Sequence, residues 1–113
     1  MPQSIPVSHF VFARARIGQG DQLGACLDRL VEPSLNTPGC LQFTLQHSSQ
    51  DPDLWLITGS WADEQAMNAW CQTPSLQVFS DIVHDLIVSS LDFHTFTTHE
   101  GVDADVQQML RAI

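Results

Sequence analysis

The chain has 113 residues, enough for one domain with a modest core, and 43% of them are hydrophobic. Thirteen acidic residues outnumber four basic ones, all arginine, so the net charge at pH 7 is -9. Clustered Lys and Arg neutralise phosphate in nucleic-acid binding, and this composition therefore predicts no binding to DNA, RNA or anionic membrane. The lack of lysine also excludes Schiff-base catalysis.

The sequence predicts a protein of the reducing cytoplasm that holds no metal. No apolar run approaches the roughly 18 residues that cross a bilayer, and the first residues lack the basic and apolar regions of a signal peptide. The three cysteines, Cys26, Cys40 and Cys71, form no C-x-x-C pair. Their odd number and wide spacing suggest neither a zinc site nor a disulfide framework.

The first half of the chain predicts a strand, a helix and two further strands. Residues 7–17 alternate between two residue sets and predict a strand, which places His9 on the same face as Val11. Asp21 is a good N-cap for a helix that is expected to end before Pro33. Turn-forming residues at 36–39 and 48–52 separate two more predicted strands, at 40–47 and 54–61.

The second half predicts an interrupted helix and a last strand. Asp63 is expected to cap a short helix, and Pro74 begins a second helical piece at the position that proline favours. Alternation over residues 90–98 predicts the fourth strand. The tail, residues 102–113, is expected to add a turn or two of amphipathic helix or to lie against a partner subunit.

This order of elements predicts an α+β fold of the ferredoxin-like β-α-β-β-α-β type, with one four-stranded antiparallel sheet and a single domain over residues 1–113. Its core is expected at about residues 7–98, followed by a tail. Helices in this fold cover one face of the sheet, and the other face would expose Phe10, Phe12, Leu54 and Leu56. Pairing of two such faces predicts a homodimer. The alternative is a monomer with scattered exposed apolar side chains.

Four segments of this chain resemble a known family. They are VFARARI at 11–17 with the glycine after it, EPSLNTPGCLQF at 32–43, SWADEQA at 60–66 and AWCQTPSL at 69–76. Their order and spacing resemble the antibiotic biosynthesis monooxygenase family, a set of dimeric α+β barrel proteins. The Pro-Gly-Cys-Leu turn and the Trp at the end of the third strand are the most specific features.

The resemblance implies oxidation of electron-rich aromatic molecules, such as quinols and anthrones, by molecular oxygen without a cofactor. The protein would bind a small phenolic or enolic ligand and help to remove its proton. The resulting anion can reduce oxygen itself, while an apolar cleft keeps water out.

Three residues are the candidate catalytic groups: Trp61, His9 and His84. Trp61 matches the family's tryptophan, and its indole N–H would donate to a bound oxygen; alternatively it is a core aromatic whose N–H meets a backbone carbonyl. His9 is the best general-base candidate by its position and chemistry. His84 lies beside an apolar stripe of the last predicted helix, and each histidine is more often structural than catalytic.

Candidate substrate-binding residues are Val11, Ile57, Met67, Trp70 and Phe79, which are equally what helices need to pack on a sheet. Several of them depart from the family pattern. Trp70 stands where the family often has a His, Ile57 where some branches have an Asn, and Met67 where some have a Tyr. The chain has no tyrosine, so a mechanism that uses a tyrosine hydroxyl is excluded.

Two other functions compete with this one. The haem-degrading branch of the family uses an Asn on the first strand and a helix His ligand, and these positions fall at about Ala13 and Ser80 here. His84 could replace that ligand only if the helix register shifted, which makes haem degradation the weaker enzyme prediction. The loss of the polar Asn and Tyr positions favours instead a non-catalytic dimeric module that binds an apolar ligand.

Overall fold

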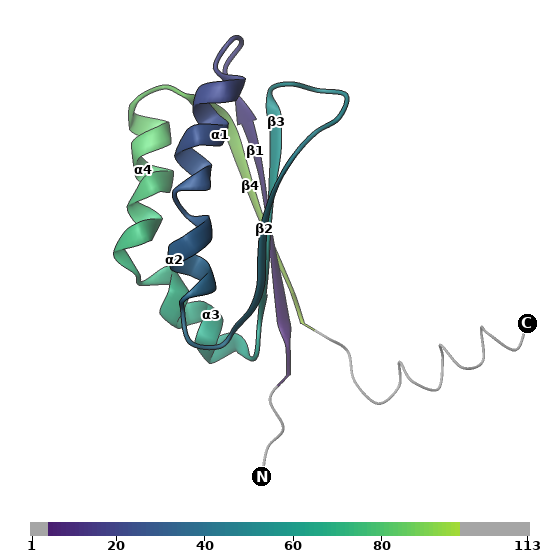
Figure 1. Cartoon of the computed structure of the whole chain (residues 1–113), viewed down its shortest axis with the longest axis vertical. Coiled ribbons are helices and arrows are strands. Elements are labelled where there is room, and N and C mark those ends of the chain that lie inside the picture. Colours follow the sequence, from purple (N-terminus) through teal and green to yellow (C-terminus); the bar gives the residue numbers. More distant parts are fainter. Residues whose placement is uncertain (1–4, 98–113) are drawn as a thin grey trace, which may run out of the picture.

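The structure is a computed structural model that describes residues 5–97, and it has one layer of helices on one sheet (Figure 1). It confirms the ferredoxin-like α+β fold. The elements follow the predicted order: β1 Val7–Ala15, α1 Gly20–Asp28, α2 Val31–Leu35, β2 Cys40–His47, β3 Leu54–Trp61, α3 Glu64–Cys71, the 3-10 turn η1 Pro74–Leu76, α4 Gln77–His84 and β4 Val88–Thr97. The predicted tail, residues 102–113, lies outside the described residues.

The four strands lie in the order β2-β3-β1-β4, and each neighbouring pair is antiparallel. The nearly continuous apolar strand β3 is central, as its composition predicts. Alternate residues of β1 are buried from Val7 to Ala15, so its two faces have different environments. We call the face against the helices the covered face and the opposite one the open face.

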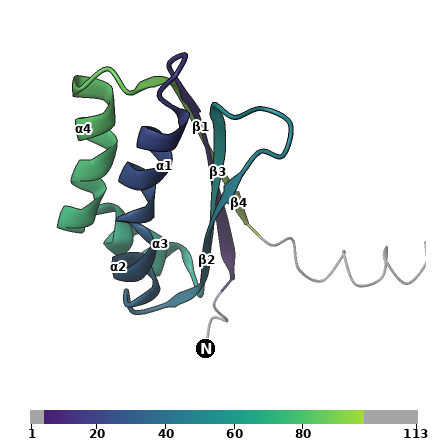
Figure 2. The same ribbon diagram turned by 45° about the horizontal axis from the view of Figure 1, so that its top comes forward.

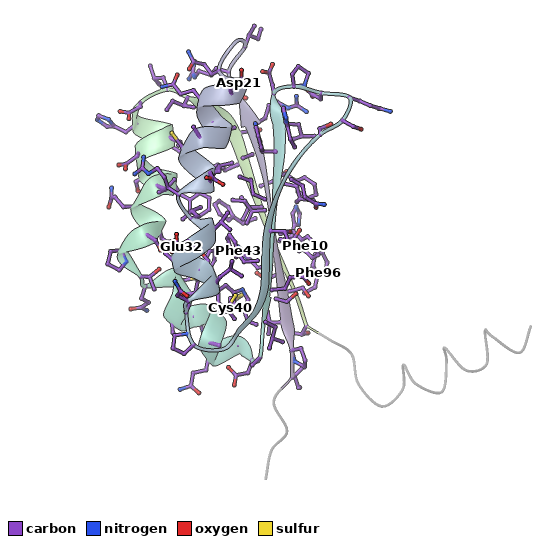
Figure 3. The ribbon with its side chains drawn as sticks, in the orientation of Figure 1. Phe10, Asp21, Glu32, Cys40, Phe43 and Phe96 are labelled. Carbon is purple, nitrogen blue, oxygen red and sulfur yellow. The ribbon has the colours of Figure 1, made fainter. Side chains whose placement is uncertain are left out.

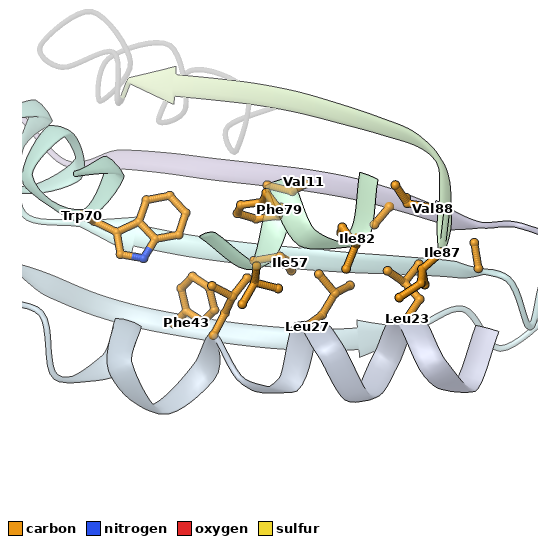
Figure 4. Close-up of a cluster of buried hydrophobic side chains, with 14 of the residues drawn as sticks. Val11, Leu23, Leu27, Phe43, Ile57, Trp70, Phe79, Ile82, Ile87 and Val88 are labelled. Carbon is orange, nitrogen blue, oxygen red and sulfur yellow. The ribbon is translucent and has the colours of Figure 1, made fainter. Parts of the chain in front are cut away.

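All four helices pack on the covered face, as two views of the molecule show (Figures 1 and 2). Leu23 and Leu27 of α1 and Ile82 of α4 are fully buried against the sheet. Figure 4 shows this core as a continuous layer, with Leu23 and Val88 near one end and Trp70 near the other. Burying such side chains is worth about 1.5–3 kcal/mol each, which makes this layer the main source of stability.

The first helical segment differs from its prediction in two ways. Asp21 is not the N-cap; it lies in the first turn of α1, whose N-cap Gln19 makes no side-chain capping bond. The helix does not run to Pro33 but stops at Asp28, and α2 then continues through Pro33. Pro33 is tolerated there because the first-turn N–H groups of a helix have no partner within the helix.

The ends of β1 and β4 also differ from prediction. Ile17 falls beyond β1 in the following turn and is 96% exposed, because Gly18 turns the chain with φ 82. Strand β4 starts at Val88, two residues before the predicted start. The reason is a tight helix end, in which the N–H of Leu86 bonds the carbonyl of Val83 and the N–H of Ile87 bonds that of Ile82. This Schellman geometry puts Leu86 at φ 59 and releases an extended chain immediately.

The open face of the sheet carries a group of aromatic side chains. Phe10 and Phe12 of β1 lie beside His94 and Phe96 of β4, and the four side chains line a shallow hollow of about 290 Å³. Figure 3 shows Phe10 and Phe96 on the side of the sheet away from the helices, while Phe43 points toward them. Leu54 and Leu56 of β3 extend the same apolar surface.

None of the helices within residues 5–97 is long and apolar enough to cross a membrane.

Candidate functional site

His9 lies on the covered face of β1 and is buried beneath the helices. The strand alternation that places Val7 and Val11 in the core also places His9 there. Its Nδ1 is 3.0 Å from the Thr95 hydroxyl oxygen of β4. The imidazole lies edge-on to Trp70, with ring centroids 5.6 Å apart, and is 6.0 Å from the ring of Phe93. His9 is therefore held by one hydroxyl and surrounded by aromatic rings.

Burial makes His9 a weak base. Loss of hydration disfavours the charged imidazolium, so the pKa of His9 is lowered from its ordinary value of 6.5. Among residues 5–97, Thr95 is the one residue that forms a hydrogen bond with the His9 side chain. At neutral pH the side chain is consequently neutral, with one ring nitrogen able to accept a proton.

Trp61 carries the most unusual atom of the site. The side chain at the end of β3 is fully buried, and its indole Nε1 is the one buried side-chain polar atom in residues 5–97 that lacks a hydrogen-bond partner. The alternative prediction, in which this N–H meets a backbone carbonyl, is wrong within that range. An unpaired buried donor costs about 1–3 kcal/mol, so the fold maintains this N–H against its own stability.

Gly59 places the Trp61 N–H near His9. A Cβ atom at position 59 would lie 3.1 Å from Trp61 Nε1 and 3.3 Å from a ring carbon of Phe43. Gly59 is also the direct cross-strand partner of His9. The missing side chain at position 59 therefore leaves room for the indole N–H over the residue that pairs with His9, on the covered face of the two inner strands.

Trp70 of α3 forms the wall above these groups. Its ring lies 5.1 Å from the Trp61 ring and 5.8 Å from that of Phe43, in addition to its contact with His9. Its own N–H is satisfied, because it donates to the hydroxyl of the fully buried Ser34 at 2.8 Å. The two tryptophans at the site thus differ: the Trp70 N–H is hydrogen-bonded to Ser34 of α2, whereas the Trp61 N–H has no hydrogen-bond partner among the described residues.

The other predicted substrate-binding residues form the apolar surroundings. Val11 and Ile57 are cross-strand partners on the covered face and are both buried. Met67 of α3 and Phe79 of α4 are buried in the same core. The Val11–Ile57 pair therefore forms an apolar floor two residues along each strand from the His9–Gly59 pair.

His84 is not brought together with His9 and Trp61. Its side chain at the end of α4 is 90% exposed, with Nδ1 3.3 Å from a carboxylate oxygen of Asp85. It lines the far end of a groove of about 470 Å³ between α4 and β4, with Phe79 and Phe93 among the other lining residues. His94 lies on the open face, on the other side of the sheet.

Two further residues of the site, Thr95 and Phe93, were not predicted from the sequence. Phe93 is 51% exposed; its ring contacts both His9 and Phe79, and so lies between the buried imidazole and the α4–β4 groove. The alternation of β4 already places Phe93 and Thr95 on one face. The signal that would have found them is the ferredoxin-like topology, which pairs the last strand with the first and sets Thr95 opposite His9.

Within residues 5–97, no group of three or more His, Cys, Asp or Glu side chains could hold a metal ion.

The two tryptophans predict different costs for the same substitution. Trp70→Phe removes a donor and leaves the buried Ser34 hydroxyl without it, whereas Trp61→Phe removes a donor that has no partner among the described residues. Both changes delete the same atoms. We therefore expect Trp70→Phe to lower the free energy of unfolding by about 1–3 kcal/mol more than Trp61→Phe in urea titrations. Equal losses would contradict this assignment of the two N–H groups.

The lowered pKa of His9 predicts a pH-dependent stability. Below its ordinary value of 6.5 the unfolded chain takes up a proton at His9 that the folded chain resists, so the free energy of unfolding should fall as pH drops through this region. Above that value both states are neutral at His9 and the effect is absent. His9→Gln should flatten the change in urea midpoint between about pH 8 and pH 5. His84→Gln is the matched control, because that side chain is exposed. Parallel pH curves for His9→Gln and the parent protein would refute the effect.

Comparisons with known proteins agree on one family and one fold. The family model described as antibiotic biosynthesis monooxygenase matches residues 6–81. The structure of PA3566 from Pseudomonas aeruginosa is similar with a TM-score of 0.79 and 23% identity, covering 88% of this chain and 99% of that chain. A candidate antibiotic biosynthesis monooxygenase from Chloroflexus aurantiacus J-10-fl has a TM-score of 0.66 and 26% identity, covering 85% of this chain and 95% of the other.

A similar structure from Deinococcus radiodurans, again a candidate antibiotic biosynthesis monooxygenase, has a TM-score of 0.75 and 22% identity over 84% of this chain and 94% of that one. Curated protein sequences gave no match. The family match extends over more than half of the chain and includes β1, β3 and α3, which carry His9, Trp61 and Trp70, but not β4. By this match, the chain belongs to the antibiotic biosynthesis monooxygenase family.

Proposed function

We propose that this protein is a cofactor-independent monooxygenase that oxidises a small electron-rich aromatic molecule with molecular oxygen. The observation that carries the proposal is the buried, unpartnered indole N–H of Trp61, which lies over Gly59, the cross-strand partner of the neutral His9. A donor and a proton acceptor within aromatic walls suit a phenol or an enol. The family membership supports the same chemistry.

His9 and Trp61 have complementary roles in this proposal. His9 accepts the proton of the bound O–H group, and the Trp61 N–H donates to the oxygen anion that forms. The anion then transfers an electron to oxygen. For an anthrone, one oxygen atom replaces two hydrogens at the reactive carbon as a new carbonyl, and the second oxygen atom leaves as water with those two hydrogens. The substrate supplies all the electrons that the reaction needs.

The surroundings suit an intermediate that water would destroy. Trp70, Phe43 and Val11 supply walls and floor without a charged group, and Phe93 closes the side toward the α4–β4 groove. We propose that the substrate enters along this groove. Exclusion of water protects the substrate radical or peroxide and strengthens the hydrogen bond from Trp61.

A homodimer is part of the same proposal. The open face presents Phe10, Phe12, Leu56 and Phe96 to solvent in one chain, and two such faces packed together would bury them. A dimeric barrel would stiffen the sheet on which His9 and Trp61 lie.

We also propose a cytoplasmic location. Cys26, Cys40 and Cys71 are free thiols in the described fold, which suits a reducing compartment.

A non-catalytic module that binds an apolar ligand is the second candidate. Ile57 supports it, because this buried side chain puts an apolar surface where family members can carry a polar Asn. Both functions use the same residues around His9 and Trp61. They differ in whether His9 and Trp61 affect a reaction or only the affinity for a ligand.

Oxygen consumption distinguishes the two functions. We expect the purified protein to accelerate oxygen uptake, in an oxygen electrode, with at least one member of a panel of hydroquinones, naphthols and anthrones. His9→Gln and Trp61→Phe should each lower the rate about 100-fold, the usual scale for loss of a general base or an oxyanion donor. His84→Gln should retain the parent rate, because its exposed side chain is not beside Trp61.

Two results would contradict the oxygenase. One is full activity in both the His9→Gln and Trp61→Phe variants. The other is thermal stabilisation of the protein by panel compounds without any oxygen uptake, which would assign the site to the binding module.

The dimer predicts a mass about twice the chain mass of 12.6 kDa in light scattering at micromolar concentration. Phe12→Glu places a charge on the open face and should give a monomer. Leu35→Glu is the matched control: Leu35 is exposed on α2 in the helix layer, so the dimer should persist. A parent protein of single-chain mass would rule the dimer out.

A further inference from the structure

The hydroxyl of Thr95 is the hydrogen-bonding partner of His9, and nothing in the proposed reaction yet uses it. Thr95 and His9 are direct cross-strand partners on β4 and β1, although 86 residues separate them in sequence. The Thr95 oxygen lies 3.0 Å from His9 Nδ1, a normal hydrogen-bond distance. The rings of Trp70 and Phe93 hold the imidazole from two other sides.

The exposed location of Thr95 allows His9 to be the donor of this bond. Thr95 lies on an edge strand and is exposed, so its hydroxyl proton can be donated to water. A hydroxyl accepts at its oxygen while it donates elsewhere. Nδ1–H of His9 can then donate to Thr95, which leaves Nε2 with its lone pair. The same arrangement serves the protonated imidazolium, because Nδ1 carries a hydrogen in both forms.

We propose that Thr95 is the positioning residue of this site: it holds His9 in the Nδ1–H tautomer and leaves Nε2 as the atom that accepts the substrate proton. The catalytic part of this inference rests on the proposed monooxygenase function, while the tautomer itself does not. A partner of this kind orients an imidazole and keeps it in the useful tautomer.

A neutral partner also defines the class of substrate. A carboxylate beside Nδ1 would stabilise the imidazolium and make His9 a stronger base. Thr95 carries no charge, and burial opposes protonation further. His9 is thus matched to O–H groups that are already acidic, such as a phenol or enol conjugated to a carbonyl or a second ring. Simple alcohols and unactivated phenols should be poor substrates.

Nitrogen-15 NMR of the imidazole side chains tests the tautomer directly. In the parent protein at about pH 8, where imidazoles are neutral, we expect the proton of His9 on Nδ1. The His9→Gln variant identifies the His9 signals among those of the five histidines. Thr95→Val keeps the side-chain shape without the oxygen and should move the proton wholly or partly to Nε2. Thr95→Ser should restore the parent pattern.

Thr97 provides the matched control. It lies two residues further along β4 on the same face, and its cross-strand partner is Val7 rather than His9. Thr97→Val should leave the His9 tautomer unchanged. With an active substrate, Thr95→Val should lower kcat about tenfold with little change in KM, and Thr95→Ser should recover most of the loss.

The proposal fails if His9 of the parent protein carries its proton on Nε2, or if Thr95→Val leaves the tautomer unaltered while the variant remains folded by its amide spectrum. Its failure is distinguishable from that of the proposed function. A tautomer that depends on Thr95 in a protein without oxygen uptake would support Thr95 as the positioning residue and remove only the monooxygenase.

Discussion

The ring of Trp70 is the point at which five elements of the fold meet. From α3 it contacts Trp61 of β3, His9 of β1 and Phe43 of β2, and its N–H reaches Ser34 of α2. No other described side chain joins the helix layer to three strands in this way through both ring contacts and a buried hydrogen bond. The positions of His9 and Trp61 therefore depend on how this one indole is held.

The site next to Trp70 has few polar groups, so each of them has a large effect on how a ligand could bind or react there. Apart from the Trp70 N–H and the Ser34 hydroxyl, which bond each other, the polar groups assigned to the site are the unpaired Trp61 N–H, the His9 imidazole and the Thr95 hydroxyl. An unpaired donor in a core lowers stability, and the proposed substrate would give the Trp61 N–H a partner. The low polarity also keeps His9 neutral, and a neutral base in a dry site suits the removal of a proton from an acidic O–H group.

The fold was predictable because its strongest signals are local. Alternation in residues 7–15 identified the buried face of β1, and Asp63 marked the start of α3 through a cap whose carboxylate accepts from Ala66 at 2.8 Å. The stop of α1 at Asp28 had no such signal, because neither glycine nor proline stands at that end. The continuation through Pro33 follows from its place in a first turn, which the sequence does not reveal unless the preceding stop is known.

The candidate site was predictable only in part, because its decisive contacts join distant strands. Sequence reasoning identified His9 and Trp61 by type and by position on a strand. It gave no information on whether the Trp61 N–H would find a partner, since that depends on the packing of Phe43 over Gly59. The sequence also did not show that His84, at the end of α4, faces solvent and lies apart from His9 and Trp61.

The irregular strand pairing near Ser89 determines which residues of β4 lie on the covered face and which lie on the open face. Arg14 pairs with Ser90 and Ala15 with Val88, so Ser89 is an extra residue, and its hydroxyl donates to the carbonyl of Arg14 at 3.1 Å. Because side chains of a strand alternate, an insertion of one residue after this point would bring His94 to the place of Thr95 beside His9, and a one-residue deletion would bring Phe96 there. The open face would change at the same time. A one-residue insertion or deletion in this strand would thus exchange its two faces, whereas a two-residue insertion would keep the faces but put Phe93 in place of Thr95 beside His9. The contact between Thr95 and His9 therefore requires a fixed number of residues between Ser89 and Thr95.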